Sequence, residues 1–367
     1  MTESAVEPEA GHAPPQPAAP TRFAFGETFT GHMVTAAWTV DGGWEPDTLR
    51  PRAPLAMDPA MVGLHYGQVV FEGLKAHRQA DGTLGVFRPE DHARRFQRSA
   101  RRLAMPELPV GTFLRAADDL VRADAGLLPD DPALSLYLRP VLYASEPVLA
   151  LRPAREYRFL MIAFLTGGFF ADRPDPVSVW VARDQSRAAP GGTGDIKCAG
   201  NYAPGYPAQQ RAALAGCHQV IWLDAAERHW VEEMGGMNVF FVRGTGARRR
   251  LVTPPRTGTI LPGITRDSVF ALGRRLGLDT AEERLSADEW RRACRSGDLT
   301  EAFACGTGAG VTPIGTVHDG DDRWDVADGG PGRVTLAVRE ALAAAQQGRT
   351  PHLAHWIRRV PGTARTH

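Results

Sequence analysis

Two lysines stand out in this 367-residue chain, because Lys75 and Lys197 are the only lysines among its 42 basic residues. The chain otherwise uses arginine, so a retained lysine is enriched for reactions that need a nucleophilic amine, such as Schiff-base formation. Lys197 ends a glycine-rich stretch, GGTGDIK (191–197). That stretch is not a phosphate-binding P-loop, since Ile196 and Cys198 replace the required Gly and Ser or Thr. A solvated lysine in a surface loop is the alternative, and composition alone does not separate the two.

Two adjacent carboxylates, Glu232 and Glu233, stand at the end of a predicted strand and precede the pair Gly235-Gly236. Side chains alternate across a strand, so we expect one carboxylate to be solvated and the other to point inward. An inward carboxylate needs a cationic partner. The alternative, which the residues alone favour, is a pair of surface acids at a turn.

A third candidate lies at the start of a predicted helix, in the segment TILPGITR (259–266). Pro262-Gly263 leaves the backbone N–H groups of Ile264 and Thr265 free at the helix N-terminus, where an anion such as a phosphate can bind. An ordinary capped helix is the alternative.

Composition excludes several classes of function. With 42 acidic and 42 basic residues the formal charge is zero, which gives no footprint for nucleic acid or an anionic membrane. No stretch approaches the roughly 20 apolar residues of a membrane span. The first basic residue is Arg22, so we expect no secretory signal. The four cysteines form no CxxC pair; we expect free thiols, a cytoplasmic protein and no metal site.

The elements that must hold these residues suggest a mixed α/β (α+β) fold in two domains, because strands and helices do not alternate regularly. Residues 1–21 are rich in Ala and Pro and are expected to be disordered. We expect a small α/β domain over 22–171, a linker over 172–176, and a large domain over 177–367.

Several local patterns are specific. Asp81-Gly82 predicts a hairpin turn, and Pro89 opens a helix. Alternation over 134–139 puts Tyr137 and Arg139 on one strand face. We also expect a helix over about 201–215, and one that begins with a Ser286/Glu289 capping box.

Six motifs in order resemble the branched-chain amino acid aminotransferases, which are fold type IV (class IV) pyridoxal-phosphate enzymes. The motifs are FEGLKAHR (71–78), SLYLRP (135–140), GGTGDIKCAGNY (191–202), VEEMGGMNVF (231–240), VTPPRTGTILPGITRDS (252–268) and EAFACGTG (301–308). The resemblance runs from about residue 23 to about residue 360 and implies a two-domain fold with the cofactor, pyridoxal 5′-phosphate, at the domain interface.

The resemblance implies a role for each matching residue. Lys197 corresponds to the lysine that forms the Schiff base, Glu233 to the carboxylate on the pyridine nitrogen, and Tyr202 to the tyrosine on the phenolic oxygen. The residues that correspond to the phosphate site are Arg95, Ile264, Thr265 and Thr307. Those that correspond to the substrate pocket are Tyr66, Phe71, Tyr137, Arg139, Gly308 and, from the partner chain of a homodimer, Leu151.

The implied reaction interconverts leucine, isoleucine or valine and 2-oxoglutarate with the branched-chain 2-oxo acid and glutamate. Arg139 would receive the distal carboxylate of glutamate, and Lys75 matches no catalytic position. Gly308, Ala199 and His77 depart from residues usual in the family, and the segment 146–151 lacks the usual Gly. The departures at Gly308 and over 147–151 leave open an unusual aliphatic or aromatic amino acid of specialised metabolism. Two enzymes of the same fold, a D-amino acid aminotransferase and an aminodeoxychorismate lyase, also fit the resemblance, as does a cofactor-binding protein without turnover.

Overall fold

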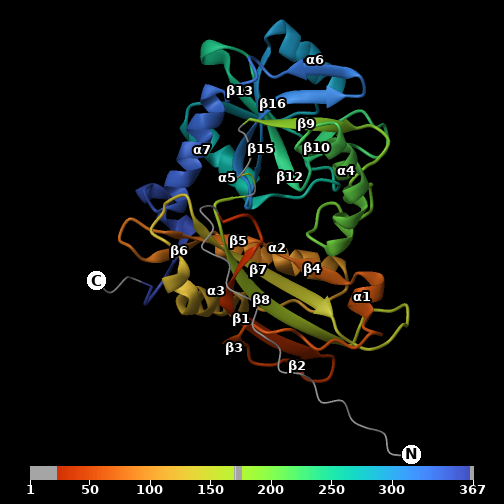
Figure 1. Ribbon diagram of the computed structural model, residues 1–367, viewed down its shortest axis with the longest axis vertical. Coiled ribbons are helices and arrows are strands. Elements are labelled where there is room, and N and C mark those ends of the chain that lie inside the picture. The colour runs from red at the N-terminus through yellow and green to blue at the C-terminus, as the bar shows by residue number, and fades with distance from the viewer. Residues whose placement is uncertain (1–22, 169, 171–175, 364–367) are drawn as a thin grey trace, which may run out of the picture.

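The computed structural model describes residues 23–168, 170 and 176–363. The predicted tail, 1–21, and most of the predicted linker, 172–176, lie outside the described residues. Within the described part, strands form two nine-stranded sheets, with helices packed against each (Figure 1). This confirms the predicted mixed α/β class. None of the helices in that part is long and apolar enough to cross a membrane.

The first sheet is built mainly from the N-terminal half of the chain. Its strand order is β18 (Ile357–Val360), β6 (Leu84–Phe87), β5 (Leu74–Arg78), β7 (Ser135–Ala144), β8 (Glu156–Thr166), β1 (Thr28–Thr39) and β2 (Gly43–Trp44), with β3 (Thr48–Pro51) on β1 and β4 (Val69–Phe71) on β7. Helices α2 (Pro89–Arg102) and α3 (Val110–Asp124) share its main hydrophobic core, and α1 (Val62–Tyr66) precedes β4.

Three predicted elements of this half are confirmed. The hairpin around Asp81-Gly82 is β5–β6, and Pro89 is the first residue of α2. Along β7, Leu136 and Leu138 lie in the core. Arg139 lies on the face of Tyr137, with its guanidinium carbon 5.4 Å from the centroid of that ring.

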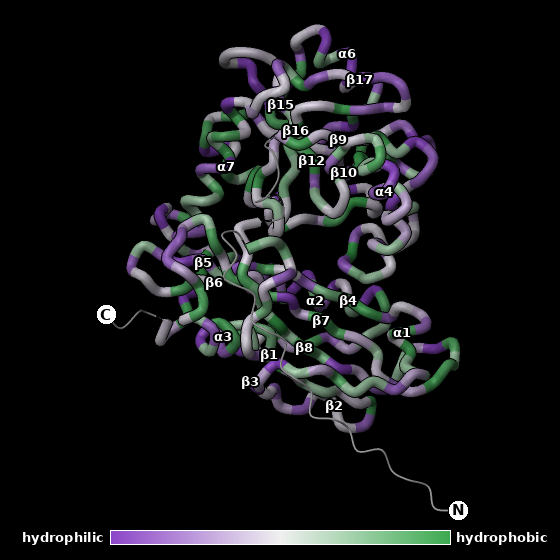
Figure 2. The backbone as a smooth tube through the Cα atoms, viewed as in Figure 1, coloured by the Kyte–Doolittle hydropathy of each residue, from purple (hydrophilic) through white to green (hydrophobic). Residues whose placement is uncertain are grey.

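The second sheet has the order β11 (Val231–Met234), β10 (Gln219–Leu223), β9 (Val177–Ala182), β16 (Gly310–Asp319), β15 (Leu299–Gly306), β12 (Met237–Arg243), β13 (Arg250–Thr253) and β14 (Asp279–Glu282), with β17 (Asp322–Asp325) on β16. Since β11 also pairs with β12, six of these strands close into a ring. The helices of this part are α4 (Tyr206–Leu214), α5 (Ile264–Arg275), α6 (Ala287–Ser296) and α7 (Arg333–Gln346). Figure 2 shows hydrophobic stretches along the strands of both sheets and hydrophilic ones on outer loops.

Two expectations about the second half need correction. The helix expected over about 201–215 starts only at Tyr206, because two short 3-10 turns, Ala199–Asn201 and Ala203–Gly205, precede it, and Pro204 lies in the second. The capping box of Ser286 and Glu289, by contrast, is confirmed at the start of α6.

The second correction concerns the end of the chain, which was expected in the second domain. β18 pairs antiparallel with β6 of the first sheet, so the predicted boundaries do not account for this strand.

Candidate active site

Lys197 lies between the two sheets and is held by the first one. Its backbone N–H donates to the hydroxyl of Ser99 on α2 (3.1 Å), and its carbonyl accepts from the N–H of Phe71 at the end of β4 (3.0 Å). Its amine donates to the phenolic oxygen of Tyr202 at 2.8 Å. The glycine-rich segment therefore presents this lysine at a fixed position rather than as a solvated side chain.

Aromatic rings surround this amine. The Nζ atom of Lys197 lies 4.9 Å from the ring centroid of Phe71 and 5.4 Å from that of Tyr202, and the two rings are 5.0 Å apart. Rings at this distance attract a cationic amine and exclude water from one side of it. The pair combines a nucleophilic amine with a phenol that can share its proton.

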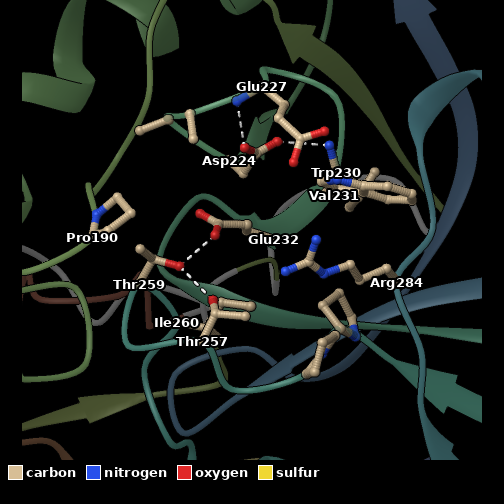
Figure 3. Close-up of a pocket in the computed structure, with 14 residues that line it drawn as sticks. Pro190, Asp224, Glu227, Trp230, Val231, Glu232, Thr257, Thr259, Ile260 and Arg284 are labelled. Atoms are coloured by element: carbon tan, nitrogen blue, oxygen red, sulfur yellow. Dashed lines mark hydrogen bonds between the residues drawn. The ribbon is translucent and has the colours of Figure 1, made fainter.

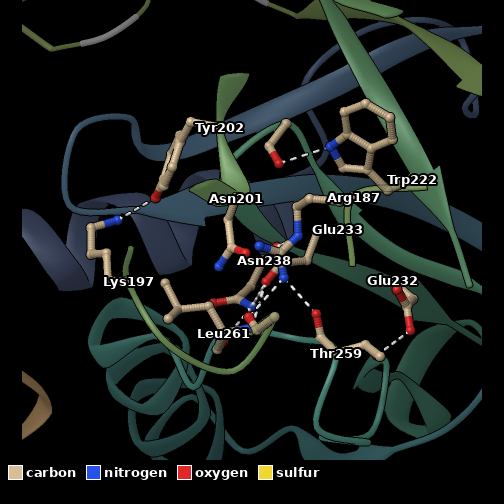
Figure 4. A network of polar contacts seen from close by, with 12 residues as sticks. Arg187, Lys197, Asn201, Tyr202, Trp222, Glu232, Glu233, Asn238, Thr259 and Leu261 are labelled. Atoms are coloured by element: carbon tan, nitrogen blue, oxygen red, sulfur yellow. Dashed lines mark hydrogen bonds and ion pairs between the residues drawn. The ribbon is translucent and has the colours of Figure 1, made fainter. Parts of the chain in front are cut away.

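Glu233 is buried on β11 and has polar partners on both oxygens (Figure 4). One oxygen accepts from the N–H of Leu261 (2.9 Å) and the side-chain amide of Asn238 (3.2 Å). The other lies 2.7 Å from Nε of Arg187. The expectation that an inward carboxylate has a cationic partner is confirmed, although the partner, Arg187, carried no sequence signal that we recognised.

Burial raises the pKa of Glu233 to about 7, against the opposing charge of Arg187 and the hydrogen bond from Leu261. A carboxylate with a raised pKa gains from any cationic group that comes to it, because that group restores the charge balance lost by desolvation. The site therefore favours a further cationic group near Glu233.

Arg95 provides a second buried charge, on the inner face of α2. Its guanidinium makes two hydrogen bonds to Glu72, of 2.6 and 2.9 Å, and a longer one of 3.3 Å to the carbonyl of Pro262. Nδ1 of His92 also lies 2.7 Å from Glu72. Burial alone would raise the pKa of Glu72, but the adjacent Arg95 and His92 hold it well below its usual range. Glu72 stands in the FEGLKAHR motif, but its role in fixing Arg95 was missed.

Pro262 connects Arg95 to the N-terminus of α5. Ile264 is the first residue of α5, Gly263 is its N-cap residue, and no side chain caps the helix. The N–H groups of Ile264 and Thr265 are therefore available to an anion, as the sequence indicated. Thr307 lies in the tight turn between β15 and β16.

The predicted side-chain pocket is partly assembled within one chain. Tyr137 is buried, stacks on Phe164 with ring centroids 4.7 Å apart, and meets the edge of Phe25 at 5.0 Å. The guanidinium carbon of Arg139 lies 5.0 Å from the ring centroid of Phe71. Among the described residues Arg139 has no ion-pair partner, so its charge is free for a ligand.

Lys75 also lies at this pocket, which the sequence did not indicate. It pairs with Tyr137 across β5 and β7, and its amine donates to the carbonyl of Gly308 at 3.4 Å. Burial lowers the pKa of Lys75 to about 8. A side chain at Gly308 would come within 3.1 Å of the ring of Phe25, so the small residue there leaves room for that ring.

Two predicted pocket residues are not gathered with the others within the single chain. Tyr66 is 48% exposed, and its hydroxyl donates to the carbonyl of Leu149. Leu151, two residues further along the same loop, is 88% exposed. These two residues do not contribute to a closed pocket in one subunit.

The expectation that one of the two adjacent carboxylates is solvated is wrong. Glu232 is only 6% exposed, and its carboxylate accepts a hydrogen bond from the hydroxyl of Thr259. The register between β10 and β11 shifts at this point, where Trp222 pairs with Glu233 and Leu223 with Val231, which leaves Glu232 as an extra, bulged residue. All four residues of β11 are buried, and the loop that carries Thr259 lies against the carboxylate of Glu232.

Comparisons with known proteins agree with this geometry. A family model described as Amino-transferase class IV matches residues 69–317. The branched-chain-amino-acid aminotransferase of Mycolicibacterium smegmatis is 48% identical over 339 residues, which cover 92% of each chain. The chain belongs to the class IV aminotransferase family. A probable branched-chain-amino-acid aminotransferase of Streptomyces coelicolor is 50% identical over 334 residues, or 91% of each chain.

Solved structures of class IV aminotransferases share the fold. The Escherichia coli branched-chain amino acid aminotransferase superimposes with a TM-score of 0.73 at 26% identity, over 89% of this chain and 99% of that chain. The branched-chain aminotransferase of Thermoproteus uzoniensis, solved with norvaline, gives 0.72 at 26% identity, over 89% and 99%.

The cofactor of the family is pyridoxal 5′-phosphate, and a further structural relative, also 26% identical, was solved with pyridoxamine 5′-phosphate. The residues present in this chain fit the cofactor: a buried carboxylate, a fixed lysine, and an uncapped helix N-terminus beside an arginine.

Proposed function

We propose that the protein transfers amino groups between L-leucine, L-isoleucine or L-valine and 2-oxoglutarate, yielding the branched-chain 2-oxo acids and L-glutamate. This proposal rests on the relatives of the chain: it is 48–50% identical, over more than nine-tenths of its length, to branched-chain aminotransferases or probable ones. The aromatic lining supplied by Phe71 and Tyr137 suits an aliphatic side chain.

Lys197 would anchor the cofactor and move the proton. When bound, pyridoxal phosphate supplies an electron sink for the electrons of the Cα–H bond. The amine of Lys197 would take the proton from Cα as general base and would then deliver it, as general acid, to the C4′ carbon of the cofactor. Tyr202, 2.8 Å from that amine, would orient it and share its proton.

The other cofactor contacts follow from charge. Glu233 would hold a proton on the ring nitrogen, with Arg187, Asn238 and Leu261 fixing its carboxylate. Arg95 and the N–H groups of Ile264 and Thr265 would bind the phosphate, together with Thr307. These contacts position the cofactor without covalent chemistry of their own.

The pocket must accept both an aliphatic side chain and the distal carboxylate of glutamate. Phe71, Tyr137 and Gly308 would form the walls, and Arg139 offers the free cation. Such a pocket distinguishes side chains that differ by one methylene by only about 1–3 kcal/mol, so all three branched-chain amino acids should react.

We infer a cytoplasmic homodimer. Leu151 is too exposed to act in its own chain, and Tyr66 holds its loop through Leu149, so both would complete a pocket with the partner subunit. The four cysteines, Cys198, Cys217, Cys294 and Cys305, are all free thiols, as is usual in a reducing compartment. We also propose the domain division 22–171 and 177–367, with β18 returning to the first sheet.

Half-reaction rates with a panel of L- and D-amino acids test the proposal. The cofactor's absorbance should change rapidly with leucine, isoleucine and valine and should recover with 2-oxoglutarate. Arg139→Met should slow the glutamate half-reaction more than the leucine one. Slow reaction of all three branched-chain amino acids beside fast reaction of another amino acid would overturn the substrate assignment.

A further inference from the structure

A second pocket, of about 120 Å³, lies beside the cofactor site (Figure 3). Its walls come from the segment before β11, from the loop that leads to Leu261, and from Arg284. Glu232 lies in its wall, whereas Lys197, Tyr202 and Glu233 do not line it. The pocket is therefore separate from the site described above.

Glu232 contributes to this pocket a carboxylate with one oxygen that lacks a hydrogen-bond partner among the described residues. One of its oxygens accepts from Thr259, while Oε2 has no hydrogen-bond partner among the described residues although it is buried. Burial raises the pKa of Glu232. A buried carboxylate oxygen without a partner is costly, and a ligand that donates hydrogen bonds, above all a cation, would relieve that cost.

The two other acids of the wall do not compete for such a ligand. Asp224 is already satisfied, because it accepts from the backbone N–H groups of Glu227, His229 and Trp230, at 2.7, 2.9 and 2.8 Å. Glu227 itself is exposed to solvent. Glu232 is thus the buried carboxylate with a free site for a ligand.

Arg284 brings the opposite charge. Its guanidinium carbon lies 5.5 Å from the ring centroid of Trp230, and it forms no ion pair with a described residue. In Figure 3 the guanidinium reaches toward the middle of the pocket, beside Glu232, yet the two side chains are not within ion-pair distance of each other. One carboxylate and one guanidinium with space between them match a molecule that carries both an ammonium and a carboxylate group.

We propose that this pocket binds a small zwitterionic α-amino acid, whose ammonium group contacts Glu232 and whose carboxylate contacts Arg284. Guanidinium binds a carboxylate through paired hydrogen bonds, and the free oxygen of Glu232 accepts from the ammonium group. The remaining wall includes Val231, Pro254 and Ile260, which suits a short aliphatic side chain. The small volume favours a small amino acid. The inference is independent of which amino acid is the substrate.

Occupancy of this pocket would affect the cofactor site through two residues, Thr259 and Arg187. The hydroxyl of Thr259 donates to Glu232, and its carbonyl accepts from Arg187, whose Nε lies 2.7 Å from Glu233 (Figure 4). A ligand that changes the charge of Glu232 or moves Thr259 therefore changes the surroundings of the carboxylate that faces the ring nitrogen. The amino acid would act as an effector.

Calorimetric titration of the holoenzyme with 2-aminoisobutyrate tests the proposal, because this amino acid lacks an α-hydrogen and is not transaminated. We expect two binding events per chain, one in the active site and one here, and a shift in the cofactor's absorbance spectrum with the second event. Isobutyrate and isopropylamine, which each lack one of the two charges, should bind the second site about tenfold or more weakly.

Variants assign the second event. Glu232→Gln and Arg284→Ala should each lose it and keep the first, and Arg284→Ala changes an exposed side chain, so its fold should be retained. The matched control is Arg275→Ala, another exposed arginine, which should keep both events. A single binding event in the wild type, or a second event that survives in both variants, would overturn the proposal. A second event without a spectral shift would overturn the link to Glu233.

Discussion

Lys197 and Lys75 both lie near the substrate pocket, yet their partners differ. The amine of Lys197 meets a phenol, whereas that of Lys75 meets the carbonyl of Gly308. Lys197→Ala should abolish the Schiff-base absorbance and transamination, because no other amine lies beside Tyr202. Lys75→Gln should keep the absorbance, since a donor to Gly308 remains. Borohydride reduction and peptide mapping should label Lys197, and a label on Lys75 would contradict the assignment.

Glu233 gives the protein a pH dependence of its own. Without cofactor its pKa is raised from 4.5 to about 7, so the folded state holds its proton more tightly than the unfolded state. Its contribution to stability is therefore present below about pH 4.5 and is lost as the pH rises through about 7. In cofactor-free protein, Glu233→Gln should be most stabilising, relative to wild type, at pH 7 and above. Thermal unfolding of both proteins from pH 5 to 8 measures this; an equal difference at every pH would contradict it.

Among the individual residues of the site, the sequence identifies those that lie within one motif better than those that come together only in the folded chain. Lys197 and the pair Glu232 and Glu233 carry signals of residue type and position, and the resemblance to the family added Tyr202. Arg187 and Thr259 carry no such signal, because each becomes a partner of a carboxylate only when loops distant in sequence meet at β11. Glu72 has a signal in its motif, but its role depends on Arg95 and His92, which come from α2.

Among the elements, β5 and β7 depend on one glycine. Gly73 joins β4 to β5, and a Cβ atom there would lie only 1.7 Å from the hydroxyl oxygen of Tyr137. Gly73→Ala must therefore displace Tyr137 or the strand, at a cost of about 1–3 kcal/mol. We expect a higher KM for leucine and a lower melting temperature. In the control, Gly111→Ala on α3, the nearest atom would lie at an ordinary 3.6 Å, so the KM should not rise and the melting temperature should not fall. Equal behaviour of the two variants would contradict the argument.

The patterns of hydrophobicity and turns predicted β5–β6, α2 and the α6 capping box, because each depends on neighbours in sequence. They did not predict the bulge at Glu232 or the return of β18 to β6. Both depend on pairing with strands far away in the chain, which local patterns do not specify. The same reason explains why Glu232 was expected in solvent: the loop that carries Thr259, distant in sequence, lies against its carboxylate.

For the whole molecule, the exposed loop around Leu151 makes the proposed dimer testable through activity. Each pocket would use Lys197 from its own chain and Leu151 from the partner. Leu151→Asp should fold normally, because this side chain is 88% exposed in the single chain, yet it should react slowly with leucine, since a charge would enter an apolar pocket. Lys197→Ala should be inactive.

Mixing the two variants and allowing the subunits to exchange then gives a decisive result. In a mixed dimer one pocket carries both defects, whereas the other has the Lys197 of one chain and the Leu151 of its partner intact. Random exchange should restore roughly a quarter of the wild-type sites, although each variant alone is impaired. Leucine turnover of the mixture, compared with that of the unmixed variants, measures this. No gain on mixing, with subunit exchange verified by mass labelling, would mean that each pocket is completed by its own chain.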